Sequence, residues 1–210
     1  MPFTPYKVMF RTLILSYIML FISDVSAQNA EEELAQYSVG VGVGPFGGSL
    51  GFLYHFDAKT TLQVSLGGLP ESDSPLALSL NGVEYDVAGA SSWVGFFLNH
   101  RPIENAEWFR VNAGLGVGSI QNSIVNPNTL AAYSADYREN PVAYLGIGAG
   151  LRAKKGIQLG FDLGWLQTNG PEYSIDDVGS ADASDFRDVR ESGHFTTALP
   201  NIQFSFGYGF

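Results

Sequence analysis

The chain has 210 residues, a formal net charge of −10 at pH 7, 45% hydrophobic residues, 25 glycines and no cysteine. Without cysteine, disulfides, cysteine-ligated metals, thiol catalysis and a lipid-modified N-terminal cysteine are excluded. The acidic balance does not suit a nucleic-acid-binding protein, and the length allows one or two domains.

The first segment has the layout of a secretory signal peptide. Lys7 and Arg11 give a positive start, residues 12–22 are an apolar run, and Val25 and Ala27 occupy the small-residue positions before a cleavage site. The apolar run is too short for a spanning helix, which needs about 20 residues. An N-terminal membrane anchor is therefore the weaker alternative.

We accordingly expect residues 1–27 to direct export and then to be removed, with 28–36 left as a short periplasmic segment and 37–210 as the folded domain. Removal takes away two of the 11 basic residues and one of the 21 acidic residues, so the exported chain stays acidic.

The exported chain shows a period of two almost everywhere, which is typical of β-strands. Eight alternating segments are predicted as strands: 37–44, 49–56, 61–67, 91–100, 109–119, 143–152, 157–165 and 201–210. One face of each carries Val, Leu, Ile or Phe, and the other carries mainly Gly, Ser, Asn and Gln. In 91–100 the facing is ambiguous, and Gly95 and Asn99 suggest that Val94, Phe96 and Leu98 face outward.

The glycine-rich faces need a reason, because glycine disfavours strands. A narrow barrel supplies one, since eight strands leave an interior that side chains just fill. Apolar side chains would then face lipid. A lipocalin-like barrel or a sandwich is the soluble alternative, and the thin charge on both faces argues against it. We predict an all-β fold, an eight-stranded antiparallel up-and-down transmembrane β-barrel.

The connections between these segments alternate in length. Short turns are expected at 57–60, 101–107 and 154–156, and long polar loops at 68–90, 120–141 and 166–196, with the short connection 45–48 as the exception. In bacterial outer-membrane barrels the short turns are periplasmic and the long loops are outside. Gly156 suits the left-handed position of a three-residue hairpin.

Aromatic residues near the strand ends suggest two interfacial girdles. The expected periplasmic girdle is Tyr37, Phe56, Trp108, Phe109 and Phe210. The expected outer girdle is Phe46, Trp93, Tyr144 and Trp165.

With these features the chain resembles the small outer-membrane β-barrel family of Gram-negative bacteria, the OmpA/OmpX/OmpW-like group. The motif that carries the resemblance is the last strand, with alternating Ile202, Phe204, Phe206, Tyr208 and Phe210. The resemblance implies that the barrel-assembly machinery recognises this strand, and that the protein is a monomer surrounded by outer-membrane lipid and lipopolysaccharide. Because nothing follows Phe210, no peptidoglycan-binding domain is expected.

Residues 193–197 contain the candidate catalytic side chains of the sequence. His194 and Thr196 look similar to the His-x-Ser pair on the outward face of lipid A deacylase barrels. Thr stands where Ser is expected, and no carboxylate follows it, so Glu172 or Glu191 would have to orient the base. We expect both residues to lie at head-group level on the last strand, without catalysis.

The 166–196 loop is acidic, with Glu172, Asp176, Asp177, Asp182, Asp185, Asp188 and Glu191. Such carboxylates could hold Ca²⁺ or Mg²⁺. The spacing is not that of an EF-hand, so we expect a solvated, mobile loop and no metal. Inside the barrel, Arg110, Arg152 and Asp162 are candidates for a buried charge network. No cofactor motif is present.

We therefore expect an outer-membrane barrel with a structural or cell-surface interaction role. A narrow channel for small or apolar solutes is the first alternative, and a lipid A-modifying enzyme is the second.

Overall fold

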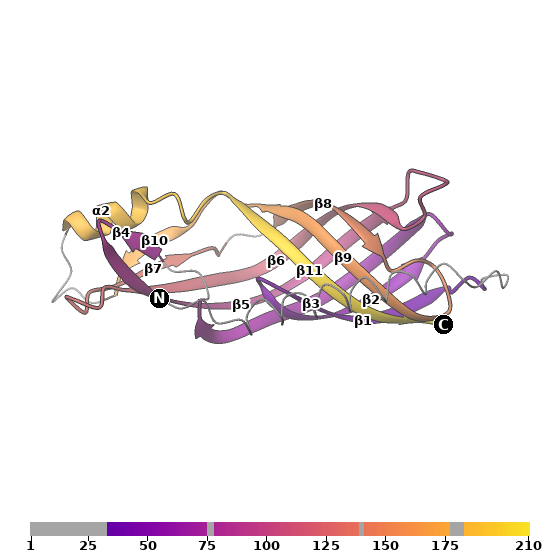
Figure 1. Cartoon of the computed structure of the whole chain (residues 1–210), viewed down its shortest axis with the longest axis horizontal. Coiled ribbons are helices and arrows are strands. Elements are labelled where there is room, and N and C mark those ends of the chain that lie inside the picture. Colours follow the sequence, from indigo (N-terminus) through magenta and orange to yellow (C-terminus); the bar gives the residue numbers. More distant parts are fainter. Residues whose placement is uncertain (1–32, 75–77, 139–140, 177–182) are drawn as a thin grey trace, which may run out of the picture. The chain divides into compact units, whose positions relative to one another are not determined.

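The computed structural model describes residues 33–74, 78–138, 141–176 and 183–210. The expected signal peptide, 1–27, lies outside these residues. Eight of the described strands form the barrel (Figure 1): β1 (Tyr37–Gly44), β2 (Gly47–His55), β3 (Thr60–Asp73), β5 (Val83–His100), β6 (Phe109–Val125), β8 (Val142–Gly150), β9 (Gly156–Gln167) and β11 (Ala198–Gly209).

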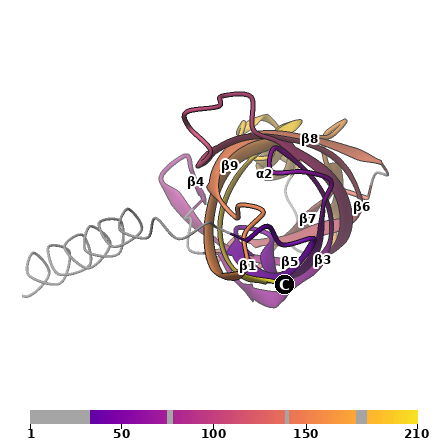
Figure 2. The same ribbon diagram turned by 90° about the vertical axis from the view of Figure 1, so that its right-hand side faces the viewer.

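Neighbouring barrel strands are antiparallel, and the last pairs with the first. β11 joins β1 from Ser38, opposite Gly209, to Val43, opposite Phe204. Viewed along the strands, the chain forms a closed ring (Figure 2). The predicted eight-stranded antiparallel up-and-down barrel is confirmed.

The barrel strands turn their larger apolar side chains outward, as the alternation predicts. Ile157 is 72% exposed, Phe204 59% and Phe96 56%. Phe96 faces out while its neighbours Trp93 and Phe97 line the lumen, which settles the facing of the 91–100 segment. The result is an apolar belt of the kind that meets lipid in transmembrane barrels.

The last strand closes the barrel to its final residue. Phe210 N–H donates to the Tyr37 carbonyl at 2.9 Å, and Tyr37 N–H donates to the Phe210 carbonyl at 3.2 Å. The aromatic rings of these two residues stack with centroids 6.2 Å apart. Ile202, Phe204, Phe206 and Tyr208 all present exposed side chains on the outer face. Their recognition by the assembly machinery stays a prediction.

The glycines make room for rings inside the narrow barrel. A Cβ at Gly146 would lie 2.6 Å from the Tyr144 hydroxyl oxygen, and a Cβ at Gly164 would lie 2.5 Å from the same atom. A Cβ at Gly95 would lie 2.5 Å from the Phe97 ring. Real Cβ atoms do not approach this closely, so the crowding argument for the glycine-rich faces is confirmed.

Above the barrel, the expected loops 68–90, 120–141 and 166–196 contain regular structure instead. β3, β5 and β6 extend beyond their predicted ends. They are joined by β4 (Leu78–Leu80), β7 (Ala132–Asp136), β10 (Glu172–Ile175) and the helix α2 (Ala183–Glu191). The strands follow the order β4-β5-β6-β7-β10. We call this sheet and its helix the lobe (Figure 1). In the described part of the chain, no helix is long and apolar enough to cross a membrane.

The lobe has a hydrophobic core of its own. Its buried members are Leu78, Tyr85, Ile124, Ala131, Tyr133, Ala135 and Val189, none more than 4% exposed. α2 places Val189 and Phe186 on the sheet, and Asn126 Nδ2 donates to Asp185 Oδ2 at 2.7 Å. The expectation of a solvated loop over 166–196 is therefore wrong for its described part. This segment supplies one strand of the sheet, β10, and the helix α2 that covers it.

The core face of the lobe continues the inner face of the barrel. β5 and β6 pair without interruption from Asp86, opposite Val125, to His100, opposite Val111. Side chains alternate along a strand, so Val87 shares a face with Trp93, which lines the lumen. α2 thus packs on the side of the sheet that faces the axis of the barrel.

Candidate functional site in the barrel lumen

The two ends of the barrel differ. The short-turn end holds the β2–β3, β5–β6 and β8–β9 turns together with Tyr37 and Phe210. The long-loop end holds the β1–β2 turn and the lobe. Aromatic residues ring the short-turn end as predicted, with Phe56 58% and Trp108 60% exposed.

The short-turn end of the lumen is filled by side chains and by the segment before β1. Ala35 N–H donates to the Ala153 carbonyl at 3.2 Å, and Leu34 forms a β-bridge with Lys154. Ala35 and Leu53 are both 2% exposed. The described residues of the expected periplasmic segment 28–36 therefore pack across the short-turn end of the lumen.

Leu151 completes this closure, because the backbone reverses the alternation there. Gly150 has φ 77° and Leu151 has φ 47°, and β8 ends at Gly150. The Leu151 side chain is 5% exposed and reaches the space beside Gly160. Arg152 lies past the end of β8 with its side chain 27% exposed, and it pairs with Glu107 at 3.0 Å. Its prediction as a lumen residue is wrong, because the alternation does not continue past Gly150.

The Gly156 prediction is confirmed in the same hairpin, since its φ is 94°. Arg101 ties this hairpin to the β5–β6 turn. It is 2% exposed, and its guanidinium donates to the carbonyls of Glu107 at 3.1 Å and Leu151 at 2.5 Å. Burial lowers the pKa of Arg101 to about 10, so it keeps its charge at neutral pH.

A chain of polar side chains lies at the same end of the lumen. Ser38 Oγ lies 2.8 Å from His55 Nε2, and His55 Nδ1 lies 2.7 Å from Thr61 Oγ1. Gln158 Nε2 donates to Ser38 Oγ at 3.4 Å. These residues are buried, and they were not predicted as a site. Their signal in the sequence is that each polar residue occupies an inward position.

The predicted charge network is confirmed for Arg110 and Asp162. Arg110 Nη2 donates to Asp162 Oδ2 at 2.6 Å and Arg110 Nε donates to Oδ1 at 3.3 Å. Asn112 Nδ2 also donates to Asp162. Arg110 is 1% and Asp162 7% exposed, so the pair is isolated from bulk water. Gly148 leaves the space that the two side chains occupy.

Aromatic residues line the lumen beyond this pair. Phe97 and Tyr144 meet edge to face, with ring centroids 5.5 Å apart. Trp93 Nε1 donates to the Phe46 carbonyl at 3.1 Å. Phe46, Trp93 and Tyr144 line the lumen, so their assignment to an outer girdle is wrong. They occupy inward positions or the turn, and Trp165, 59% exposed, faces outward as predicted.

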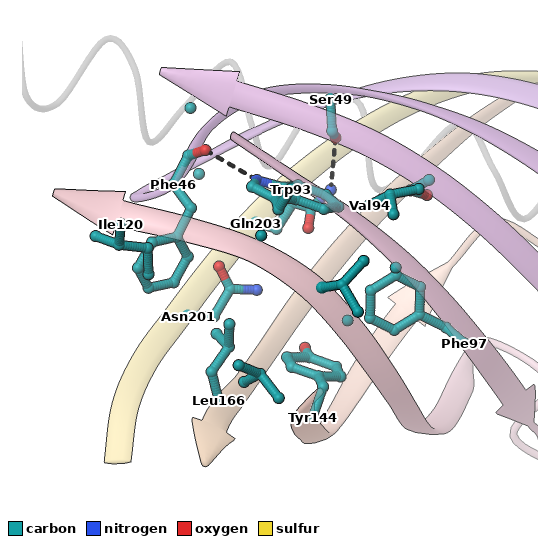
Figure 3. A pocket seen from close by; sticks show the side chains of 18 of the residues that line it. Phe46, Ser49, Trp93, Val94, Phe97, Ile120, Tyr144, Leu166, Asn201 and Gln203 are labelled. Carbon is teal, nitrogen blue, oxygen red and sulfur yellow. Dashed lines mark hydrogen bonds between the residues drawn. The ribbon is translucent and has the colours of Figure 1, made fainter. Parts of the chain in front are cut away.

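These aromatic residues enclose a cavity of about 110 Å³, which we call the chamber (Figure 3). The chamber begins at Asn112 and Asp162 and reaches the long-loop end at Phe46 and Thr168. Its polar wall consists of hydroxyl and amide side chains: Ser49, Gln63, Ser65, Asn99, Ser119, Asn201 and Gln203.

The catalytic candidates are not on a strand. His194 and Thr196 are exposed and precede β11, which begins at Ala198. Thr196 Oγ1 donates to the Ala198 carbonyl at 2.8 Å. The expected placement of both residues on the outward face of the last strand is therefore wrong. Apolar alternation begins only after Pro200, and the preceding residues link α2 to the barrel.

Two acidic residues of α2 have amide partners. Asp185 accepts from Asn126, and Asp188 accepts from Asn81 Nδ2 at 2.5 Å. Asp177 and Asp182 lie outside the described residues. Among the residues the structure describes, no group of three or more His, Asp or Glu side chains could hold a metal ion.

The closed antiparallel ring, its apolar belt and its packed interior define a membrane-spanning β-barrel of the outer-membrane type. No protein-family model matches the chain, and no curated protein matches it. Solved structures do share its fold.

The crystal structure of CarO from Acinetobacter baumannii is similar with a TM-score of 0.61 at 15% identity, over 86% of this chain and all of that one. That of CarO2 from the same organism gives 0.63 at 16% identity, over 85% of this chain and all of that one. A major outer membrane protein from Thermus thermophilus gives 0.51 at 16% identity, with the same coverage. At these identities the likeness establishes the fold.

Proposed function

We propose that the protein is an outer-membrane barrel that acts at the cell surface, as a structural or interaction protein, and that it does not conduct solutes. The lobe is the observation that carries the proposal. Two barrel strands extend into it without a break, and its core includes Ile124 and Val189 at 0% exposure. A packed unit at one end of a barrel supports a role at that end.

The closure of the short-turn end supports the second part of the proposal. Ala35, Leu53 and Leu151 are buried there, and the Arg110–Asp162 pair lies beyond them. A solute crossing the barrel would have to displace both layers. A narrow channel is the second candidate, favoured by the chamber, which reaches one end of the lumen.

Conductance separates these two candidates. The purified protein in planar bilayers should show no stable current steps. Leu151→Ala should stay silent as well, because the Arg110–Asp162 pair still fills the lumen. Two results together would establish the channel instead. The wild type would show reproducible single-channel steps, and the steps of a Leu151→Cys variant would be blocked by cysteine-directed reagents.

The proposal includes no catalysis. In support, Thr196 Oγ1 donates its proton to the Ala198 carbonyl and not to a side-chain base, and His194 is exposed. Mass spectrometry of lipid A from cells that overproduce the protein tests this. We expect unchanged acylation, and loss of one acyl chain that depends on His194 would overturn it.

The long-loop end is proposed to face the outside of the cell and the short-turn end the periplasm, with the barrel as a monomer in lipid and lipopolysaccharide. Support comes from the even strand number, which places Tyr37 and Phe210 at the short-turn end, as in bacterial outer-membrane barrels.

A further inference from the structure

We propose that the chamber is a binding site for one small, uncharged, hydroxyl-bearing ring, the size of a single sugar unit. This inference concerns the lumen and does not depend on the role of the lobe. It rests on four observations: an unpaired buried amide, a neutral wall, a mixed set of donors and acceptors, and a fixed aromatic face.

The unpaired amide belongs to Asn112, at the inner end of the chamber. Asn112 is 3% exposed, and its Nδ2 donates to Asp162. Within the described part of the chain, its Oδ1 has no hydrogen-bond partner. Buried polar atoms in proteins are nearly always bonded, to protein, water or ligand. An N–H or O–H donor inside the chamber would satisfy this oxygen.

The wall of the chamber is neutral. Asp162 is its one Asp, Glu, Lys or Arg residue among the described lining residues, and Arg110 neutralises it at 2.6 Å. A charged guest would leave water without gaining an opposite charge, which is unfavourable in a low-dielectric site. The chamber therefore favours an uncharged guest.

The polar wall offers donors and acceptors together. Gln203 Nε2 donates to Ser49 Oγ at 3.2 Å, and Asn99 Nδ2 donates to Gln63 Oε1 at 3.1 Å. Amide and hydroxyl groups keep both kinds of bonding capacity after one such bond. A hydroxyl group also donates and accepts, so several hydroxyls on one ring can match this wall.

The aromatic side is held in place before any guest arrives. Trp93 is fixed by its bond to the Phe46 carbonyl, and Ser91 Oγ donates to the same oxygen at 2.9 Å. Figure 3 shows Trp93 and Gln203 on one side of the chamber and Tyr144 and Asn201 on the other. Sites of this kind combine apolar ring surfaces with a few placed polar groups.

The size of the chamber fits the same guest. The chamber has a volume of about 110 Å³. By the same measure of volume, one water molecule needs roughly 10–15 Å³. The chamber thus has room for on the order of eight water-sized groups, which suits one ring with its hydroxyls, so a longer chain could insert only its terminal ring.

Binding can be measured with Trp93 as the reporter. Trp108→Phe and Trp165→Phe remove the two other tryptophans, which lie exposed outside the chamber. The full chain is folded into liposomes without glycosidic detergent, since a sugar head group would compete. Glucose, galactose and N-acetylglucosamine are titrated to about 50 mM, a range that reaches the millimolar affinities typical of weak binding, and a short oligosaccharide is titrated in parallel.

We expect a saturable change in Trp93 fluorescence with at least one neutral sugar. Glucosamine, which carries the same ring with a positive charge, should bind at least tenfold more weakly than N-acetylglucosamine. Tighter binding of the free sugar or of the oligosaccharide identifies the source of the ring, and either result supports the site.

Two variants place the binding in the chamber. Gly116→Leu should abolish it by filling the space. A Cβ at Gly116 would lie no closer than 3.4 Å to its neighbours, which is an ordinary contact distance. Asn112→Leu should weaken binding at least tenfold. No saturable change with any sugar, equal binding of glucosamine, or unchanged binding to Gly116→Leu would each overturn the proposal.

Discussion

Replacing Asp162 by Ala should be among the most destabilising single changes in the barrel. Asp162 accepts bonds from Arg110 Nε, Arg110 Nη2 and Asn112 Nδ2, and the Arg110 side chain is 2% exposed. Without Asp162, Arg110 remains as a buried and unpaired charge. Removing one partner of such a pair costs about 3–5 kcal/mol, which lowers the folding equilibrium constant by roughly 100- to 4,000-fold.

The assay is equilibrium unfolding by urea in lipid vesicles, followed by tryptophan fluorescence. Asp162→Asn serves as the matched control, because it keeps the shape and one acceptor and removes the charge. The double variant Arg110→Met/Asp162→Leu removes both charges and should recover most of the loss, since apolar replacement of a buried pair is often neutral or stabilising.

The reasoning fails if Asp162→Ala unfolds within about 1 kcal/mol of the wild type, given the roughly 3–5 kcal/mol expected for a buried pair. It also fails if the double variant is destabilised by the sum of the two single changes. An Asp162→Ala chain that does not fold, beside a double variant that does, agrees with the argument.

Three further outcomes are expected. Phe206→Asp should slow insertion into vesicles and lower the free energy of unfolding by a few kcal/mol, less than Phe206→Arg does. Phe206→Leu should insert at the normal rate, and equal rates for all three variants would show that β11 does not take part in the assembly step. Cys at Arg187 should react with an impermeant maleimide on intact cells and Cys at Lys59 should not, and the reverse pattern would invert the orientation. The backbone N–H groups of Lys59 and Thr60 hold the pKa of Asp57 below its usual value, so its contribution to stability is present above the pKa of the unfolded chain and declines as pH falls through the folded pKa. Asp57→Asn should flatten this acid-side decline in unfolding curves, and an unchanged slope would show that the turn does not sense pH.

Much of the barrel could be predicted from the sequence because its rule is local. A period of two specifies which side of a strand meets lipid, and it placed Arg110 and Asp162 correctly inside. The same rule misplaced Arg152, because Gly150 and Leu151 have positive φ and reverse the alternation after β8. The sequence pattern does not predict this reversal.

The lobe was missed for a different reason. Leu78, Ile124, Tyr133 and Val189 come from four separate segments, each too short or too polar to signal a core alone. Only their arrangement around the extended β5–β6 ladder makes a core. The chamber needed the same kind of information, because Asn112 becomes unusual only when its neighbours are known.

The uninterrupted β5–β6 ladder links the strand register in the barrel to the packing of the lobe. A slip of one residue between strands moves every side chain to the opposite face. If β5 and β6 paired one residue out of register within the barrel, Val87 or Ile124 would turn away from α2, and the lobe would lose its core. By contrast, β3 and β5 shift register between Leu69 and Ser72, before the lobe begins. Packing of the lobe core therefore favours one register of the β5–β6 hairpin, because a pairing shifted by one residue would leave that core unformed.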